Sequence, residues 1–453
     1  GRSFFFFFLG HSFNDIDWNY LGNGKLWAYQ LNYFDFLSNE ETGEGIEKIN
    51  HFIKNLSEDS LGLEPYPTSL RLVNVIKFLS QREVNNKKID QVLYSQAYHL
   101  KNNLEYHLLG NHLLENGFAL YFCSFYFRDE ALFNVAKKVI DDELEEQVFS
   151  DGGHFELSPM YHKIILERLL DCINLQSHNG WHSLPKLITV AKKMLSWLEN
   201  MTLESGGVPF FNDSSKSMGK TTKQLMDYAI RLGIEWEKLP LGDSGYLKVS
   251  NPKYELIMDR GPIGPDYIPG HGHCDMLSFH LQVLGQDVIT NNGISTYEAC
   301  ERRLEERSVR SHNTVSVGGC EQSEIWSSFR VGDRAQILER HSENGCLIGS
   351  HDGYFKNFGV IHKRIFSPHE NEICILDWTG DVKSEAFFLF HPDRVVSLDG
   401  GEVMVDDMII KFEGEITNLE LETYQFASGF NNLIPAKKAM VTFHSYLKTQ
   451  IFL

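Results

Sequence analysis

In the first half of the chain, apolar residues recur at intervals of three and four, which is the pattern of amphipathic helices. Two ends are clear: Ser158-Pro159 places an N-cap before a proline at the first helical position, and Gly206-Gly207 stops the helix before it. Short polar loops favour antiparallel neighbours packed as helical hairpins. The predicted helices are residues 70–80, 91–109, 111–127, 129–149, 158–175, 184–201 and 220–233.

After about residue 240 the pattern changes to short alternating runs that end in turn residues, which is typical of strands. The strands follow one another without helices between them, which favours antiparallel sheets stacked as a sandwich. We therefore expect a helical domain at residues 1–240 and a β-sandwich domain at 241–453. The predicted strand segments are residues 246–250, 254–261, 277–290, 313–319, 335–340, 345–353, 361–380, 387–392, 395–415 and 440–446.

The composition excludes some classes of function. The chain has 453 residues and a formal net charge of −19, which argues against a nucleic-acid-binding protein and requires a local basic patch for any anionic ligand. Its seven cysteines, without CxxC spacing, indicate buried thiols rather than a disulfide framework. The five phenylalanines at Phe4–Phe8 are too few to span a membrane and lack the flanks of a signal peptide, and no later segment has transmembrane character.

Two candidate sites lie at predicted helix starts. Asn111 and His112 begin a helix in GNHLLENG, where unpaired N–H groups and the positive end of the dipole suit a carboxylate. Tyr161 and His162 lie in the first turn after Ser158-Pro159, where the same dipole favours a phenolate and therefore proton transfer. Structural roles fit both pairs as well: a helix cap with a packed histidine, and an interfacial tyrosine.

Two further candidates lie in the predicted sandwich. In GHGHCD, His271 and His273 point the same way from an extended chain, and Asp275 could orient one imidazole, so a metal site and a solvated turn fit equally well. In ERRLEERSVRSHNTV, His312 begins a strand just after a cluster of arginines. An anionic substrate needs such a cluster, although glutamates at helical spacing could pair with it instead. The arginines are Arg302, Arg303, Arg307 and Arg310.

Taken in order, these motifs resemble the heparinase II/III-like polysaccharide lyases, and the resemblance also covers WAYQLNYFDFL from Trp27 and GQDVITNNGISTY ending at Tyr297. It implies an α+β multidomain fold, with an N-terminal incomplete (α/α) toroid of helical hairpins followed by a C-terminal antiparallel β-sandwich. It further implies a bacterial enzyme of the periplasm or the exterior, with an anionic, uronic-acid-containing polysaccharide bound between the two parts. The oligomeric state is not indicated.

The resemblance also implies roles for particular residues. Asn111 and His112 would neutralise the substrate carboxylate, Tyr161 would be the acid and also a candidate base, and His271 would be the alternative base. Independently of the resemblance, we expect substrate contacts from the arginine cluster, at Arg303, Arg307 and Arg310, and from His162.

For a metal, the resemblance implies zinc held by His273, His312 and an acidic residue at the position of Asn291. An amide is a poor zinc ligand, so we expect zinc to be weak or absent, and we expect no organic cofactor.

The reaction implied is β-elimination, in which a base removes the C5 proton of a uronate and the C4-linked oxygen leaves. A uronyl C5-epimerase would use the same proton abstraction, and a degenerate glycan-binding protein would keep the fold without the chemistry. A glycoside hydrolase would need a carboxylate pair, for which Asp151 and Glu156 are available but not marked by a motif. The motifs do not distinguish among sulfation patterns, uronate types or endo and exo action.

Overall fold

The computed structural model describes residues 2–453. They form two compact units, and each unit is built from three separate stretches of the chain. Unit 1 comprises Gly1–Val148, Ile165–Ala191 and Tyr228–Glu235, and unit 2 comprises Phe149–Ile164, Lys192–Asp227 and Trp236–Leu453. The last helix of the first half ends at Arg231, and the next strand begins at Tyr246. No helix among residues 2–453 is long and apolar enough to cross a membrane.

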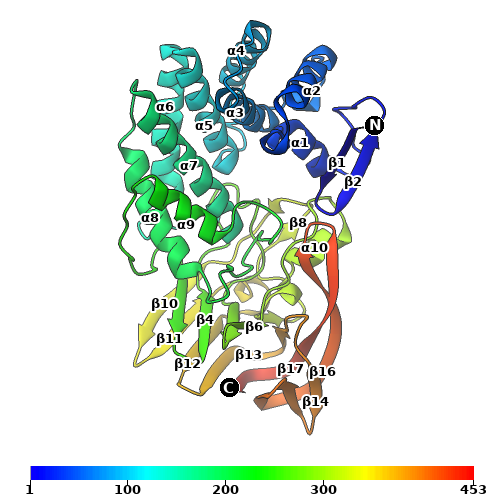
Figure 1. Ribbon diagram of the computed structural model, residues 1–453. Helices are drawn as coiled ribbons and strands as arrows, with labels where there is room; N and C mark the ends of the chain where they lie inside the picture. The colour runs from blue at the N-terminus through cyan, green and yellow to red at the C-terminus, as the bar shows by residue number, and fades with distance from the viewer. Residues whose placement is uncertain (1) are drawn as a thin grey trace. The chain divides into compact units, whose positions relative to one another are not determined.

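In unit 1, helix α5 (Gly110–Phe127) packs between α3 (Pro65–Gln81) and α6 (Glu130–Gln147) (Figure 1). Every helix predicted from the periodicity is present. The other helices of the first half, some of them shared with unit 2, are α1 (Lys25–Tyr33), α2 (Thr42–Asn55), α4 (Lys87–Asn102), α7 (Pro159–Asn179), α8 (Lys186–Met201) and α9 (Thr222–Arg231).

Three features of unit 1 differ from the prediction. Helix α4 ends at Asn102 rather than at residue 109, because the Glu105 amide donates to the Asn116 side chain instead of continuing the helix. Helices α1 and α2 were not predicted. The phenylalanine run forms an antiparallel hairpin of β1 (Arg2–Phe6) and β2 (Leu9–Phe13).

Two antiparallel sheets of unit 2 share one core, and a third, two-stranded sheet lies apart from them. The larger sheet has the order β10-β11-β12-β13-β17-β16-β15-β14, with β7 paired to β13, and the smaller has the order β3-β4-β5-β6. Phe279 and Leu281 of the smaller sheet belong to the same buried cluster as Phe366 and Phe388 of the larger one. Two sheets facing across a common apolar core form a β-sandwich.

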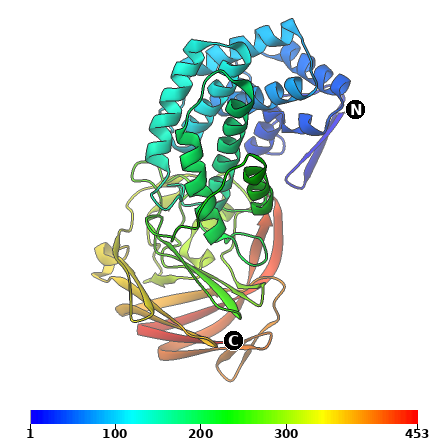
Figure 2. The same ribbon diagram turned by 60° about the vertical axis from the view of Figure 1, so that its left-hand side comes forward.

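The strands of the sandwich fall within or next to the predicted segments, but the last two are much longer than predicted. Strands β16 and β17 lie side by side over most of their length and continue the sheet from β13 (Figure 2). The bounds are β3 (Tyr246–Ser250), β4 (Tyr254–Asp259), β5 (Phe279–Val283), β6 (Gln286–Ile289), β7 (Val315–Val317), β10 (Ile337–Glu343), β11 (Cys346–His351), β12 (His362–Pro368), β13 (Glu372–Leu389), β14 (Val396–Asp399), β15 (Glu402–Val405), β16 (Met408–Gly429) and β17 (Asn432–Phe452).

A fully buried polar cluster links three strands of the larger sheet. Arg364 donates to both carboxylate oxygens of Asp377, at 2.7 and 3.1 Å, and His362 Nε2 lies 2.8 Å from the same carboxylate. His351 Nδ1 accepts from the Gly353 amide, so its Nε2–H donates to His362 Nδ1 at 3.1 Å. Each of these contacts fixes a tautomer, and both histidines are neutral.

The pKa values in this cluster make the sandwich sensitive to acid. Burial lowers the pKa of His351 and His362, while for Asp377 the Arg364 charge and the hydrogen bonds outweigh burial and lower the pKa. A lowered pKa means that the unfolded state binds more protons than the folded state. Stability is therefore present above the unfolded pKa values, about 6.5 for histidine and about 3.9 for aspartate, and is lost as the pH falls below them.

We predict that Asp377→Asn lowers the free energy of unfolding by about 3–5 kcal/mol, because it leaves the buried Arg364 charge without its partner. Denaturant unfolding at neutral pH measures this loss. The matched control is Asp381→Asn on the same strand, whose side chain is 90% exposed. We expect the control to change stability by less than about 0.5 kcal/mol. Equal losses in both variants would contradict the assignment.

Candidate active site

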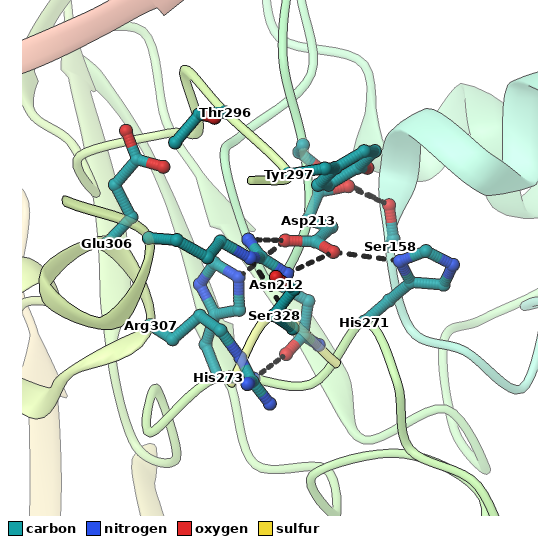
Figure 3. Close-up of polar contacts among 12 residues, drawn as sticks. Ser158, Asn212, Asp213, His271, His273, Thr296, Tyr297, Glu306, Arg307 and Ser328 are labelled. Atoms are coloured by element: carbon teal, nitrogen blue, oxygen red, sulfur yellow. Dashed lines mark hydrogen bonds and ion pairs between the residues drawn. The ribbon is translucent and has the colours of Figure 1, made fainter. Parts of the chain in front are cut away.

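The Asp213 carboxylate lies at the centre of a group of polar contacts with His271 and His273 (Figure 3). Its oxygens accept hydrogen bonds from His271 Nδ1 at 2.8 Å and His273 Nε2 at 2.7 Å. The Arg303 guanidinium pairs with both oxygens, at 2.5 and 2.8 Å. Asp213 and Arg303 are completely buried, so one ion pair holds both histidines of the HxH motif.

The local chain conformation places Asp213 against the HxH loop. Asn212 adopts a left-handed backbone with φ of 50°, and its side chain accepts from the His273 amide and donates to the Leu157 carbonyl. The Asp213 amide in turn donates to the His271 carbonyl at 3.1 Å. The two segments are thus joined through backbone as well as side chains, which fixes the histidines relative to the carboxylate.

The expected role of Asp275 as the residue that orients an imidazole is wrong, because Asp213 does this. Asp275 Oδ2 instead accepts from the Asn212 amide at 2.8 Å, and burial raises the pKa of Asp275 to about 7. Glycine is required at position 272 for a structural reason, because a Cβ there would lie 2.4 Å from the Ile263 carbonyl oxygen.

The ionisation of Asp213 determines the tautomers around it. Burial alone would raise its pKa, but the Arg303 charge and the hydrogen bonds from His271 and His273 hold that pKa well below its usual range. An ionised carboxylate only accepts, so Nδ1 of His271 and Nε2 of His273 each carry a proton. In the neutral form of His271, Nε2 is then the unprotonated nitrogen, which is the form that a general base requires.

Tyr161, His271 and Tyr297 form a compact group. The Tyr161 ring stacks on the His271 ring with centroids 3.9 Å apart, and its hydroxyl lies 3.0 Å from the Tyr297 hydroxyl. Tyr161 is positioned by the start of α7, where the Ser158 hydroxyl accepts from the Tyr161 amide and caps the helix as predicted. Two residues from distant parts of the sequence therefore meet next to His271.

The expectation that the helix dipole favours a Tyr161 phenolate is wrong. Burial, followed by the charges of Tyr297 and Asp213, raises the pKa of Tyr161 well above 10, and burial likewise raises that of Tyr297. Removal of a charged oxygen from water outweighs the modest attraction of a helix end. Both hydroxyls are protonated at neutral pH and can donate protons.

His273 and His312 come together as the sequence suggested, with His273 Nδ1 3.2 Å from His312 Nε2. Since Nδ1 of His273 is unprotonated, His312 Nε2–H is the donor. Asn291 does not complete a ligand set: its Oδ1 accepts from Asn313 and its Nδ2 donates to Ser278.

The residues present therefore do not fit a tight zinc site. Within residues 2–453, no three histidine, cysteine or acidic side chains are placed to hold a metal ion.

The predicted substrate-binding residues differ in accessibility. Arg303 is buried against Asp213, and Arg307 is buried with its donors on the carbonyl oxygens of Gly272, Ser327 and Arg330. His162 is buried and bonded to the Met194 carbonyl, and burial lowers its pKa to about 3. Their donors are already used by protein groups, which argues against direct substrate contact. Arg310, about half exposed, lies near Glu385 and Glu422.

Asn111 and His112 lie in unit 1, in the first turn of α5 as predicted. His112 Nδ1 is 3.0 Å from the Glu105 carboxylate, and its ring lies 4.3 Å from that of Tyr66. The His112 side chain is about one-third exposed, whereas Asn111 is buried.

Comparisons with known proteins agree with this architecture. A heparin-sulfate lyase of Bacteroides stercoris is 24% identical over an alignment of 246 residues. The alignment covers 47% of this chain and 36% of that protein, so the match spans little more than a third of the relative's length. The crystal structure of heparinase III superposes on this chain with a TM-score of 0.74 at 16% identity. The superposition covers 94% of this chain and 76% of the heparinase III chain. The heparan sulfate lyase of Pedobacter heparinus gives 0.63 at 15% identity, covering 97% and 78%.

These structural likenesses confirm the predicted fold class, an incomplete (α/α) toroid followed by an antiparallel β-sandwich. Family models extend the agreement to sequence in both parts of the chain. The model of the heparinase II/III N-terminus matches residues 74–232, and that of the heparinase II/III-like C-terminal region matches residues 235–451. The chain belongs to the heparinase II/III-like family.

Proposed function

We propose that this protein is a polysaccharide lyase that cleaves a uronic-acid-containing anionic polysaccharide by β-elimination. The observation that carries the proposal is the group of Tyr161, His271 and Asp213. It combines a protonated tyrosine in ring contact with a histidine whose Nδ1 is held by a buried carboxylate. Such a pair supplies an acid and a base at neighbouring positions.

The reaction requires two proton transfers. A base takes the C5 proton, the C4–O bond breaks as a C4–C5 double bond forms, and the leaving oxygen receives a proton. His271 Nε2 is suited to the first transfer, because Asp213 fixes the tautomer and stabilises the imidazolium that forms. Tyr161 is suited to the second, because its raised pKa keeps the hydroxyl protonated until the leaving oxygen gains charge.

The C5 proton becomes acidic enough only when the adjacent carboxylate is neutralised. We assign this task to Asn111 and His112, since the first turn of α5 provides donors and the positive end of a helix dipole. Glu105 fixes the His112 ring through Nδ1. These groups would stabilise the enolate more than the ground state, because charge moves onto the carboxylate oxygens as the proton leaves.

We expect the protein to release products with a C4–C5 double bond when it is incubated with heparan sulfate, chondroitin sulfate, hyaluronan or alginate in a panel. The ultraviolet absorbance of these products measures the reaction. Heparan sulfate is the first probe because similar proteins are a heparin-sulfate lyase and a heparan sulfate lyase. Exchange of the C5 proton with solvent without new absorbance would instead identify a uronyl C5-epimerase. Binding without either signal would identify a glycan-binding protein.

The matched variant for this assay is Tyr161→Phe, which removes only the hydroxyl. Loss of general acid catalysis should lower the rate at least about 100-fold. Circular dichroism should show that folding is retained. Near-parental turnover of the variant on a cleaved substrate would contradict the assignment of Tyr161.

We predict that Asn111→Ala lowers kcat more than it weakens substrate binding, because its hydrogen bond strengthens as the enolate forms. Loss of one such donor typically costs about 100-fold in kcat. Binding measured in the Tyr161→Phe background separates the two effects. Equal losses in affinity and kcat would assign Asn111 to anchoring or to the helix start instead.

We predict weak or absent zinc binding, because Asn291 stands where the family places an acidic ligand. Elemental analysis of protein purified without added metal should show sub-stoichiometric zinc. Asn291→Asp adds a negative charge beside His273 and His312 and should raise zinc uptake. Stoichiometric zinc in the parent that survives dialysis against a chelator would show that the amide does not prevent binding.

A further inference from the structure

A short hairpin next to the candidate active site carries exposed side chains that no role described above explains. We define the aromatic hairpin as residues 325–331, formed by β8 (Ile325–Trp326) and β9 (Arg330–Val331), with Ser327, Ser328 and Phe329 at its tip. Trp326 is 53% exposed and Phe329 is 40% exposed. Aromatic residues are enriched at binding interfaces, so two exposed rings on one short hairpin offer a surface on which a ligand can pack.

The hairpin is continuous with the candidate active site. The Phe329 ring lies 5.1 Å from the Tyr297 ring and 5.8 Å from the His271 ring, measured between centroids. The Arg303 guanidinium lies over both Tyr297 and Phe329, at 5.1 and 5.4 Å from their centroids. A ligand that reaches His271 therefore lies within a few ångströms of Phe329.

Two buried arginines donate hydrogen bonds to backbone carbonyls of the hairpin. Arg303 Nε donates to the Ser328 carbonyl at 3.0 Å. Arg307 donates to the carbonyls of Ser327 and Arg330, each at 3.2 Å, and more weakly to that of Trp326 at 3.5 Å. With its carbonyls turned inward, the hairpin is a fixed platform, and little conformational entropy is lost when a ligand binds to it.

The hairpin also supplies a cation. Arg330 pairs across the hairpin with Trp326, and the residue is exposed. Among residues 2–453, no hydrogen bond, ion pair or ring contact engages its guanidinium. Other arginines of this region are engaged: Arg302 with Glu306, Arg303 with Asp213, and Arg310 near Glu385. Arg330 is thus an accessible partner for a carboxylate or sulfate.

We infer that the aromatic hairpin binds the acidic sugar next to the cleaved bond, with Trp326 and Phe329 stacking on sugar rings and Arg330 pairing with a carboxylate or sulfate. The apolar C–H face of a pyranose ring packs on an aromatic face, while its charged substituents lie at the ring edge. Two exposed rings and one unengaged guanidinium on a rigid hairpin match this combination. The inference rests on the proposed function and identifies the surface that selects the substrate.

The test measures binding and turnover separately. Affinity for heparan sulfate, chondroitin sulfate and uncharged dextran is measured with Trp326→Ala, Phe329→Ala and Arg330→Ala. Each substitution is placed in the Tyr161→Phe background, which slows cleavage of the probe during the measurement. The same three substitutions in the active parent give KM and kcat. The matched controls are Trp378→Ala, another exposed tryptophan, and Arg340→Ala, another exposed arginine.

We expect each aromatic substitution to weaken binding of the anionic probe about tenfold and to raise KM by a similar factor, with kcat changed much less. Arg330→Ala should weaken binding about threefold at low salt, and the difference from the parent should vanish at high salt, as for an exposed ion pair. Arg330→Lys should recover most of this affinity. The controls and the dextran probe should show no such changes.

The outcomes separate this inference from the proposed function. Product formation with unchanged KM and affinity in the hairpin variants would contradict substrate binding by the hairpin and would support the proposed lyase activity. Binding that depends on the hairpin, without product, would support substrate binding by the hairpin and would contradict the lyase activity. Absence of binding by the parent to every anionic probe would overturn both.

Discussion

The candidate active site depends on one buried ion pair, between Asp213 and Arg303. A carboxylate with no exposed surface stays ionised only if a cation and hydrogen bonds replace the water it has lost, and Arg303, His271 and His273 provide these. Because the same carboxylate fixes both tautomers, the chemistry of His271 and its alignment are set by a residue that itself lies out of reach of solvent. The pair costs desolvation, and in return it specifies one arrangement of the site.

The sandwich supports this site through a second set of buried polar contacts. Asn313, which follows His312, donates to the Phe279 carbonyl of β5 and accepts from the Leu389 amide of β13, so it joins the two sheets. Arg364, paired with Asp377, donates to the Asn313 carbonyl at 2.6 Å. The position of His312 is therefore fixed by its neighbour's contacts with both sheets. These contacts satisfy the side-chain amide and the backbone groups of Asn313 where the polar motif meets the buried strand.

Much of the architecture follows from periodicity, because amphipathic helices and alternating strands record which face is buried. The sequence also indicated Tyr161, His271, His273 and His312 through local motifs. Asp213 was missed, since it lies in an ordinary loop, FNDSS, and acquires its role only when folding brings it to the HxH segment. The burial of Arg303 was missed for the same reason: helical spacing suggested glutamate partners, whereas its partner is 90 residues away in sequence. Long-range pairing of charges leaves no local pattern.

The burial of the basic cluster changes how an acidic protein could hold an anionic polymer. The formal net charge of −19 repels such a polymer at long range, and salt screens that repulsion beyond roughly 8 Å at physiological ionic strength. Arg303 and Arg307 cannot offset it by direct contact, because their charges serve Asp213 and the hairpin backbone. Recognition of the proposed anionic substrate then acts at short range, through stacking, a few exposed cations and directed hydrogen bonds. Stacking is insensitive to salt and to the net charge of the protein, so it is the contribution on which such a surface can most depend.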